Sequence, residues 1–400
     1  MQKAALVLLA VAGSLFGANN PVADGNEAFY NLDYDRAIAD YERAVAANPE
    51  DPAAHNHVAQ ALLYREMFRD GALESELVSG NNSFLRRPKL EPSPEVEKRF
   101  FSEIGRAMQL TRASLAENPR DTQALHALSV AYALRANYGF LVRKSWRASL
   151  SDSGQARKYD NQVTQIEPDN YDARLLQGAY DYIVGSLSWS MRALGLVAGF
   201  HGDKQRGLRT IEEVAVKGNE NRVDAEIILC ALYRREGQPL RAIPLVTKLI
   251  ERYPRNYLLR FELAQMYGAT GKRTLALDTL NEIAKMKRDN VAGYERIPWE
   301  KIYYETGNLQ FWFDDLDPAL ANLKKVTATE AQLRELDLNT GVLALMREGQ
   351  IYDLQNRHTM AVLAYREAVK FAPQSDAAKE SQRYIDSPYT LRLQQKQERG

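Results

Sequence analysis

Apolar residues recur at intervals of three and four along most of the chain, and Gly and Pro residues interrupt this pattern repeatedly. The spacing places the apolar residues on one face of an α-helix, which has a period of 3.6 residues. No segment shows the alternation of apolar and polar residues that predicts a strand. The pattern therefore predicts an all-α protein built from many short helices.

Small, aromatic and proline residues follow a fixed order within this pattern. In the segment 25–49 the ordered positions are Gly25, Tyr34, Ala37, Tyr41, Ala44 and Pro49. A small residue fits where two helices touch, an aromatic ring fills the space beside it, and a proline cannot continue the helical hydrogen bonds. We therefore expect each unit to be a pair of antiparallel helices that ends at the proline.

The same order returns along nearly the whole chain. In the C-terminal half, Cys230 and Ala264 are 34 residues apart at one position, and Ala242 and Ala276 are 34 residues apart at another. A 34-residue unit with these positions resembles the tetratricopeptide repeat. The resemblance implies a superhelical solenoid, because one hairpin cannot bury its apolar face alone and must stack on its neighbours. We count about eight hairpins.

The N-terminal half contains extra residues between the two helices of several hairpins. These insertions lie near 71–98, 139–152 and 183–206. Connections between packed helices are usually 2–8 residues long, and longer loops are normally functional or disordered. We expect one continuous solenoid over residues 19–386, followed by a disordered polar tail over residues 387–400.

The first residues differ in kind from the rest. Lys3 gives residues 1–18 a positive start, and an apolar run from Ala4 to Phe16 follows. Ala12, Ser14 and Ala18 offer small residues for cleavage. This order is typical of a secretory signal peptide. The alternative is a core helix of the first repeat. The first reading predicts an exported protein, periplasmic or extracellular and possibly associated with the cell envelope, and so suggests an exported tetratricopeptide protein of bacterial type.

Charge and motifs narrow the function classes. The chain has 52 basic and 52 acidic residues, whereas nucleic-acid binding calls for a basic surface, so we expect no nucleic-acid partner. His55 and His57 are two residues apart, and a helical metal pair needs a spacing of four. Cys230 is the only cysteine and sits at a helix contact, which favours a buried, inert thiol. We expect no cofactor, no metal and no enzymatic activity.

The resemblance also implies a concave groove lined by positions 2, 5, 9, 12 and 13 of each first helix. At these positions we expect partner contacts from Asn56, Gln60, Tyr64, His126, Tyr182, Ile227, Arg234, Phe261, Gln265, Met346 and Gln350. Apolar and amide side chains dominate the set, and the Lys and Asn pair with which chaperone-binding relatives hold a terminal carboxylate is absent. The alternative is that the inserted segments cover some of these positions.

The segment 183–200 is rich in apolar residues and carries a single charge, Arg192. It fits a hairpin packed inside the superhelix, an interfacial helix that meets a membrane or lipid, or a docking surface for an apolar partner. In the second reading the contacts would come from Trp189, Leu194, Leu196 and Phe200. Residues 195–213 also resemble an element of a eukaryotic tetratricopeptide family associated with the mitochondrial outer membrane.

A basic and aromatic segment precedes it. Its members are Arg143, Lys144, Arg147, Arg157 and Lys158, with Tyr138, Phe140 and Trp146. Such a segment binds an anionic surface, or its cations lie over an apolar face and pair with nearby acids such as Asp152 and Asp160. Both readings stay open.

These observations predict a non-enzymatic protein-interaction scaffold of the cell envelope or periplasm, with a protein or peptide partner in the groove. The alternative is a membrane-associated or lipid-handling helical protein that uses the apolar segment 183–200.

Overall fold

A computed structural model describes residues 20–69, 73, 90–187, 189, 201–328 and 338–390. Seventeen α-helices and one π-helix, and no strand, occur in these ranges. The all-α prediction is confirmed. The predicted signal peptide over 1–18 and the last ten residues of the predicted tail lie outside the described residues.

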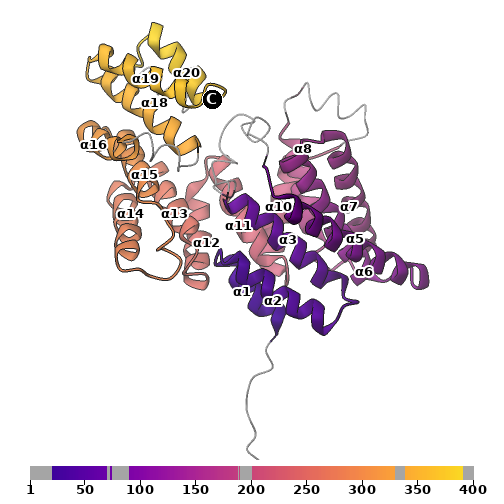
Figure 1. The fold of residues 1–400 in the computed structure, drawn as a ribbon. Coiled ribbons are helices and arrows are strands. Elements are labelled where there is room, and N and C mark those ends of the chain that lie inside the picture. The colour runs from indigo at the N-terminus through magenta and orange to yellow at the C-terminus, as the bar shows by residue number, and fades with distance from the viewer. Residues whose placement is uncertain are drawn as a thin grey trace, which may run out of the picture.

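The helices pair into eight consecutive hairpins (Figure 1). In the N-terminal half these are α1 (Pro21–Tyr30) with α2 (Tyr34–Ala47), α3 (Pro52–Arg69) with α5 (Pro94–Glu117), α6 (Thr122–Tyr138) with α7 (Trp146–Ile166), and α8 (Arg174–Gly185) with α10 (Lys204–Lys217). In the C-terminal half they are α11 (Arg222–Arg235) with α12 (Pro239–Arg252), α13 (Tyr257–Ala269) with α14 (Arg273–Arg288), α15 (Trp299–Trp312) with α16 (Leu316–Thr327), and α18 (Leu338–Leu354) with α19 (His358–Phe371). A single helix, α20 (Asp376–Asp386), covers the last hairpin.

The small positions lie where the two helices of a hairpin meet. A Cβ atom added to Gly25 would come within 2.5 Å of the Tyr41 ring, and one added to Gly349 would come within 2.3 Å of the Tyr365 ring. Ala276 is fully buried at the corresponding contact of the sixth hairpin. The repeat register read from the sequence therefore describes the packing correctly.

The N-terminal insertions are partly helical. Between α6 and α7 the chain forms a π-helix, Gly139–Arg143, and α7 then begins at Trp146. The π-helix ends at Lys144, whose φ is 51°. Asp203 caps α10 by accepting a hydrogen bond from the Arg206 N–H, 2.9 Å away. In the third hairpin, α6 and α7 are thus separated by fewer residues than the predicted insertion at 139–152.

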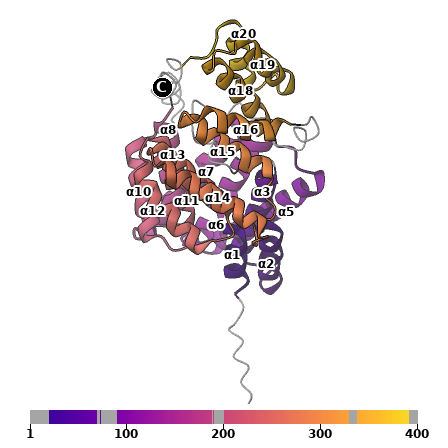
Figure 2. The ribbon, with the colours of Figure 1, turned by 90° about the vertical axis from the view of Figure 1, so that its left-hand side faces the viewer.

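The first hairpin also packs against helices that follow it by about two hundred residues. The Tyr30 hydroxyl donates to Asp224 Oδ1 at 3.0 Å, and the Asn256 side-chain amide donates to the Tyr30 carbonyl at 2.8 Å. The Arg255 N–H donates to Asn31 Oδ1 at 3.0 Å. Figures 1 and 2 show α1 beside α12. Each helix from α1 to α13 also packs on the next, so these helices form a closed circuit. We call residues 20–288, which comprise this circuit and α14, the ring.

Apolar contacts support the closure. The Tyr30 and Tyr253 ring centroids are 5.1 Å apart, and Tyr257 and Leu258 pack against the core of the first hairpin. The closure therefore buries aromatic surface as well as forming hydrogen bonds.

The remaining helices, α15 to α20 (residues 299–390), form an open extension that we call the arm. Buried Asp353 holds its end together: Asp353 Oδ2 accepts from the Tyr365 hydroxyl and from the Tyr389 N–H, both at 2.8 Å. Tyr389 is 2% exposed. The packed chain thus continues to Tyr389, beyond the boundary at residue 386 that the sequence pattern predicts.

Candidate partner-binding surface

The groove positions predicted from the repeat register form contacts between successive first helices. In the ring, Arg234 of α11 pairs with Glu262 of α13 at 2.9 Å. Gln265 of α13 donates to Glu305 Oε2 of α15, also at 2.9 Å. These residues lie on the expected face, but their polar groups connect one hairpin to the next.

The same holds earlier in the chain. Asn56 of α3 is 3% exposed, and its amide donates to the Ala127 carbonyl of α6 at 2.8 Å. Tyr182 of α8 is 2% exposed, and its hydroxyl donates to Glu236 at the end of α11 at 2.6 Å. Both side chains are too buried to meet a partner without rearrangement.

The other predicted positions divide by exposure. Phe261, Met346 and Gln350 are buried. Gln60, Tyr64, His126, Ile227, Arg234 and Gln265 are partly exposed. Tyr64 packs on Phe29 of α1 with ring centroids 5.0 Å apart. All eleven predicted residues are therefore either buried or only partly exposed.

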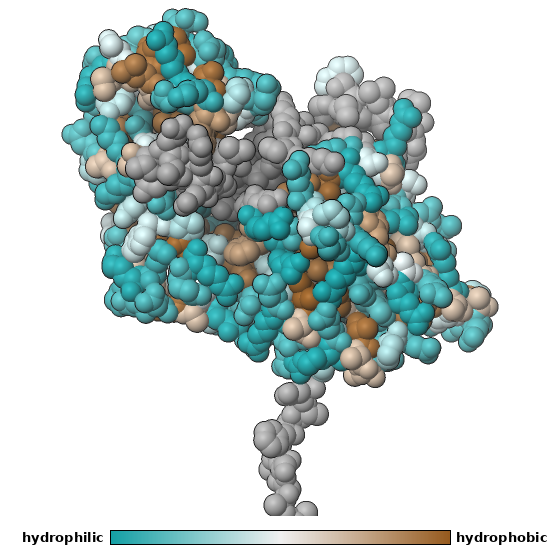
Figure 3. All heavy atoms as spheres, in the orientation of Figure 1, coloured by the Kyte–Doolittle hydropathy of each residue, from teal (hydrophilic) through white to brown (hydrophobic). Residues whose placement is uncertain are grey.

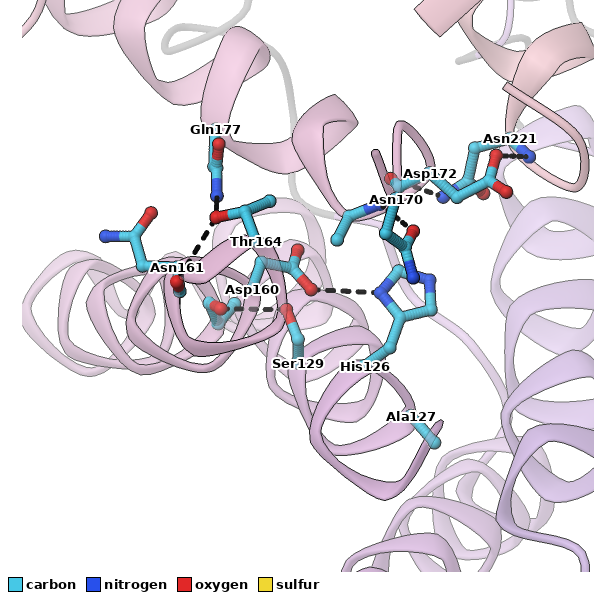
Figure 4. A network of polar contacts seen from close by, with 12 residues as sticks. His126, Ala127, Ser129, Asp160, Asn161, Thr164, Asn170, Asp172, Gln177 and Asn221 are labelled. Carbon is cyan, nitrogen blue, oxygen red and sulfur yellow. Dashed lines mark hydrogen bonds and ion pairs between the residues drawn. The ribbon is translucent and has the colours of Figure 1, made fainter. Parts of the chain in front are cut away.

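His126 belongs to a polar network between α6 and α7 (Figure 4). Its Nδ1 lies 2.9 Å from Oδ1 of Asp160, which is fully buried. Burial lowers the pKa of His126, but the hydrogen bond and charge of Asp160 outweigh it, so the net pKa lies above the ordinary value. Ser129 donates to the Ala156 carbonyl at 2.8 Å beside this pair. The His126 side chain thus contacts Asp160 of its own hairpin.

The arm presents a different arrangement on its first helices. The guanidinium of Arg347 (α18) lies 4.2 Å from the ring centroid of Phe311 and 4.8 Å from that of Trp312, both of α15. Its Nη1 donates to Gln350 Oε1 at 2.7 Å. No carboxylate pairs with Arg347 in the described ranges, and burial lowers its pKa.

Trp312 is 37% exposed and stands next to this arginine. It occupies position 13 of the seventh repeat, so the register could have identified it, although we did not include it among the groove residues. Arg347 occupies position 6 of the eighth repeat, which is not among the groove positions 2, 5, 9, 12 and 13. The Arg347 guanidinium, stacked beside an exposed indole and without an ion pair in the described chain, is therefore a feature that only the structure reveals.

The apolar segment 183–200 is described only at its start. Ile183 is 60% exposed and Trp189 is 79% exposed. Leu194, Leu196 and Phe200 lie outside the described residues. Within the ranges that the structure describes, every helix is too short or too polar to cross a bilayer.

The reactive groups considered in the sequence are in structural positions. Cys230 is 3% exposed, and burial raises the pKa of its thiol. His55 Nδ1 lies 2.6 Å from Glu103 Oε2. In the described part of the chain, no three His, Cys, Asp or Glu residues are grouped as a metal site would require.

The acids expected to pair with the basic segment take other partners. Asp152 accepts two hydrogen bonds from Arg135, at 2.6 and 2.7 Å, and Asp160 contacts His126. The pairing of the basic segment with Asp152 and Asp160 was therefore wrong. Arg143 instead pairs with Glu97 at 2.6 Å.

Comparison with known proteins agrees with the repeat register. A family model described as tetratricopeptide repeat matches residues 22–66 and 232–291, and a second model of the same description matches residues 343–375. No curated protein sequence matches the chain. The chain contains tetratricopeptide repeats and folds as a solenoid of tetratricopeptide type.

Solved structures of similar fold share little sequence with it. Yeast Tom70 is 12% identical, with 94% of this chain and 96% of that chain covered and a TM-score of 0.41. TTC0263, a tetratricopeptide protein of Thermus thermophilus, is 17% identical, with 62% and 97% covered and a TM-score of 0.34. A human IFIT1 dimer with m7Gppp-AAAA is 14% identical, with 92% and 81% covered and a TM-score of 0.43.

Proposed function

We propose that this protein is a non-enzymatic protein-interaction scaffold, exported to the cell envelope or periplasm, that binds a protein or peptide on the first-helix face of its arm. Proteins of tetratricopeptide repeats are generally non-catalytic scaffolds. The observation that carries the proposal is the Arg347 guanidinium, which lies against Phe311 and Trp312 with no carboxylate partner in the described chain.

The chemistry of this position defines the partner. A partly buried cation whose neighbouring acid, Glu380, acts on it only through charge and forms no ion pair with it favours an acidic group, because a carboxylate forms strong, bidentate hydrogen bonds with a guanidinium. The exposed Trp312 indole offers an apolar contact beside it. Trp and Arg are the residues that most often dominate binding energy at protein interfaces. We therefore expect a partner segment with an acidic residue next to an apolar side chain.

Affinity purification from the native envelope fraction tests this proposal. The unmodified protein, Trp312→Ala, Arg347→Met and Leu363→Ala are used as bait, and bound proteins are quantified by mass spectrometry. Leu363 is 53% exposed on the second helix α19, so Leu363→Ala is a matched control for loss of exposed apolar surface. Met retains most of the Arg347 packing while removing the charge.

We expect at least one protein to be retained by the unmodified bait and by Leu363→Ala and to fall at least tenfold with Trp312→Ala and with Arg347→Met. Identical sets of bound proteins with all four baits would refute a binding site at this position.

Export rests on residues 1–18 and is tested separately. Mass spectrometry of the native protein should give an N-terminus between Leu15 and Asp24. Detection of intact Met1 in a cytoplasmic fraction would contradict both the export and the envelope location.

The exposed Ile183 and Trp189 favour a second candidate function, contact with a membrane or lipid. Exposed Trp and apolar residues together are typical of segments that lie in the bilayer interface. If this function holds, the protein should float with phosphatidylglycerol vesicles, and Ile183→Ser with Trp189→Ser should abolish flotation. Absence of flotation by the unmodified protein would eliminate this candidate.

A further inference from the structure

A cavity of about 430 Å³ lies between α7 and α8, away from the first-helix face of the arm. Its walls consist of Gly154, Arg157, Lys158, Asn161, Gln162, Gln165 and Tyr180. The α7 members follow a spacing of three and four residues, so they share one face of that helix. The opposite face of α7 carries the buried residues Ala156, Asp160 and Val163. The cavity thus lies on the outward side of a helix whose inner side is firmly packed.

The lining is rich in hydrogen-bond donors and contains no carboxylate. Arg157 and Lys158 supply two positive charges. The side chains of Asn161, Gln162 and Gln165 add amide groups, and they form no hydrogen bond within the described chain. Figure 4 shows Asn161 on the side of α7 away from the His126 network. A cavity with this composition is suited to a negatively charged ligand.

Arg157 is held in position by an aromatic ring, and it shares its nearest carboxylate with another arginine. Its guanidinium lies 4.4 Å from the Tyr180 ring centroid. The Arg157 Nε is buried and has no hydrogen-bond partner. The carboxylate that pairs with Arg157 belongs to Asp181, at 4.0 Å, and it already accepts two hydrogen bonds from Arg206 at 2.8 and 3.0 Å.

An unsatisfied buried donor on a guanidinium is costly, since desolvated polar groups normally find partners. Tyr180 covers one face of the planar guanidinium, and the Arg157 side chain is 33% exposed. The N–H groups on the edges of a guanidinium match the geometry of phosphate and carboxylate groups. Lys158, one residue further and exposed, adds a mobile charge at the rim. The volume is within the range of small-molecule sites.

We propose that this cavity is a binding site for an oxyanion, a phosphate or carboxylate group of a small ligand, held by Arg157 and Lys158. The proposal is independent of the scaffold function, because neither residue belongs to the arm. The amides of Asn161, Gln162 and Gln165 then orient the remainder of the ligand.

Titration calorimetry and thermal melting of the full-length protein test the site. The probes are inorganic phosphate, succinate and phosphatidylglycerol vesicles, each at constant ionic strength set with sodium chloride, because exposed charges respond to salt alone. The variants are Arg157→Gln and Lys158→Gln. Arg366→Gln is the matched control, since Arg366 is an exposed arginine on α19 without an ion pair in the described residues.

We expect saturable binding of phosphate or succinate that raises the melting temperature. Arg157→Gln should weaken binding at least tenfold and Lys158→Gln a few-fold, while Arg366→Gln should leave it unchanged. If the protein binds both phosphate and vesicles, and vesicle binding depends on Arg157 and Lys158, the oxyanion comes from a lipid headgroup. If it binds phosphate or succinate but not vesicles, the ligand is a free anion.

Arg157→Gln removes the contact with Tyr180 and could lower stability by itself, so the melting curve of each variant is measured without ligand. Lys158→Gln carries no such risk and keeps the test decisive. Absence of saturable binding of both small anions, or binding equally reduced by Arg366→Gln, would overturn the proposal.

Discussion

The ring and the arm are built from the same repeat but present their first helices differently. In the ring, the first-helix face is used for contacts between neighbouring hairpins, and α1 closes onto the segment from α11 to α13 through Tyr30, Asn31 and Asn256. In the arm no such closure exists among the described residues, and on the same face Trp312 stays 37% exposed beside Arg347. The difference shows that repeat type alone does not determine where a solenoid binds.

The surface supports this contrast. The face in Figure 3 is largely hydrophilic, with apolar residues in scattered patches, one of them on the arm. A closed circuit distributes strain over many interfaces, whereas an open stack depends only on nearest neighbours. We therefore expect damage in the arm to stay local and damage at the closure to reach both of the segments that it joins.

The largest effect is expected from Tyr365→Ala in the arm. Tyr365 is fully buried, and its hydroxyl donates to Asp353. Removal of a buried aromatic ring costs about 3–5 kcal/mol of unfolding free energy. Hydrogen exchange followed by mass spectrometry should show faster exchange in residues 338–390 and unchanged exchange in the ring. Faster exchange in α1 or α2 would mean that ring and arm unfold as one unit.

A smaller but more widespread effect is expected from Tyr30→Ala in the ring. Tyr30 is partly exposed, so the expected loss is about 2–3 kcal/mol, from the aromatic contact with Tyr253 and the hydrogen bond to Asp224. Hydrogen exchange should accelerate both in residues 20–47 and in residues 222–258. Tyr30→Phe is the control, because it keeps the aromatic contact with Tyr253 and loses only the hydroxyl, which lowers the free energy of unfolding by about 1 kcal/mol. Acceleration limited to the first hairpin would disprove the closure.

The sequence predicts the helices and their pairing well because these depend on local spacing. Ala276 and Ala361 are fully buried as the repeat register requires, and α10 begins at Lys204, as expected from Asp203. The closure could not be predicted in this way. Tyr30 and Asp224 are 194 residues apart, and their meeting depends on the small rotation of each hairpin summed over several repeats.

The predicted groove residues show the same limit. Counting repeat positions correctly assigned Gln265 and Arg234 to the first-helix face. It could not predict whether these side chains would contact Glu305 and Glu262 or remain open. Such pairings depend on side-chain rotamers and on the distance between adjacent helices, and neither is encoded in the repeat spacing.

Ala276→Leu sharpens the comparison at the junction between ring and arm. Ala276 is fully buried in α14, and added methylene groups in a filled contact cost about 1–3 kcal/mol. We expect a lower melting temperature and faster exchange in α13 and α15, extending to α1 through Tyr257 and Leu258. The neighbouring Leu275 is 46% exposed, and Leu275→Ala should change stability by less than about 0.5 kcal/mol. Equal effects of the two changes would show that the repeat register is wrong here.

The smallest expected effect is a dependence of the closure on pH. Burial raises the pKa of Asp224 to about 6, and the hydrogen bond from Tyr30 only partly opposes this. Tyr34, Tyr41 and Tyr64, from the helices packed around it, stay neutral in this range because burial raises the pKa of each of them further above 10.

A carboxyl whose pKa is higher in the folded state than in the unfolded state stabilises the fold fully below about pH 4 and loses that contribution as the pH rises through about 6. We therefore expect the closure to weaken by about 1 kcal/mol between pH 4 and pH 6.5, a value reduced for the partial exposure of Asp224. Asp224→Asn should remove this slope from the pH dependence of exchange in residues 20–47, while exchange in the arm keeps its wild-type pH dependence. If the slope persists in Asp224→Asn, another titrating group controls the interface.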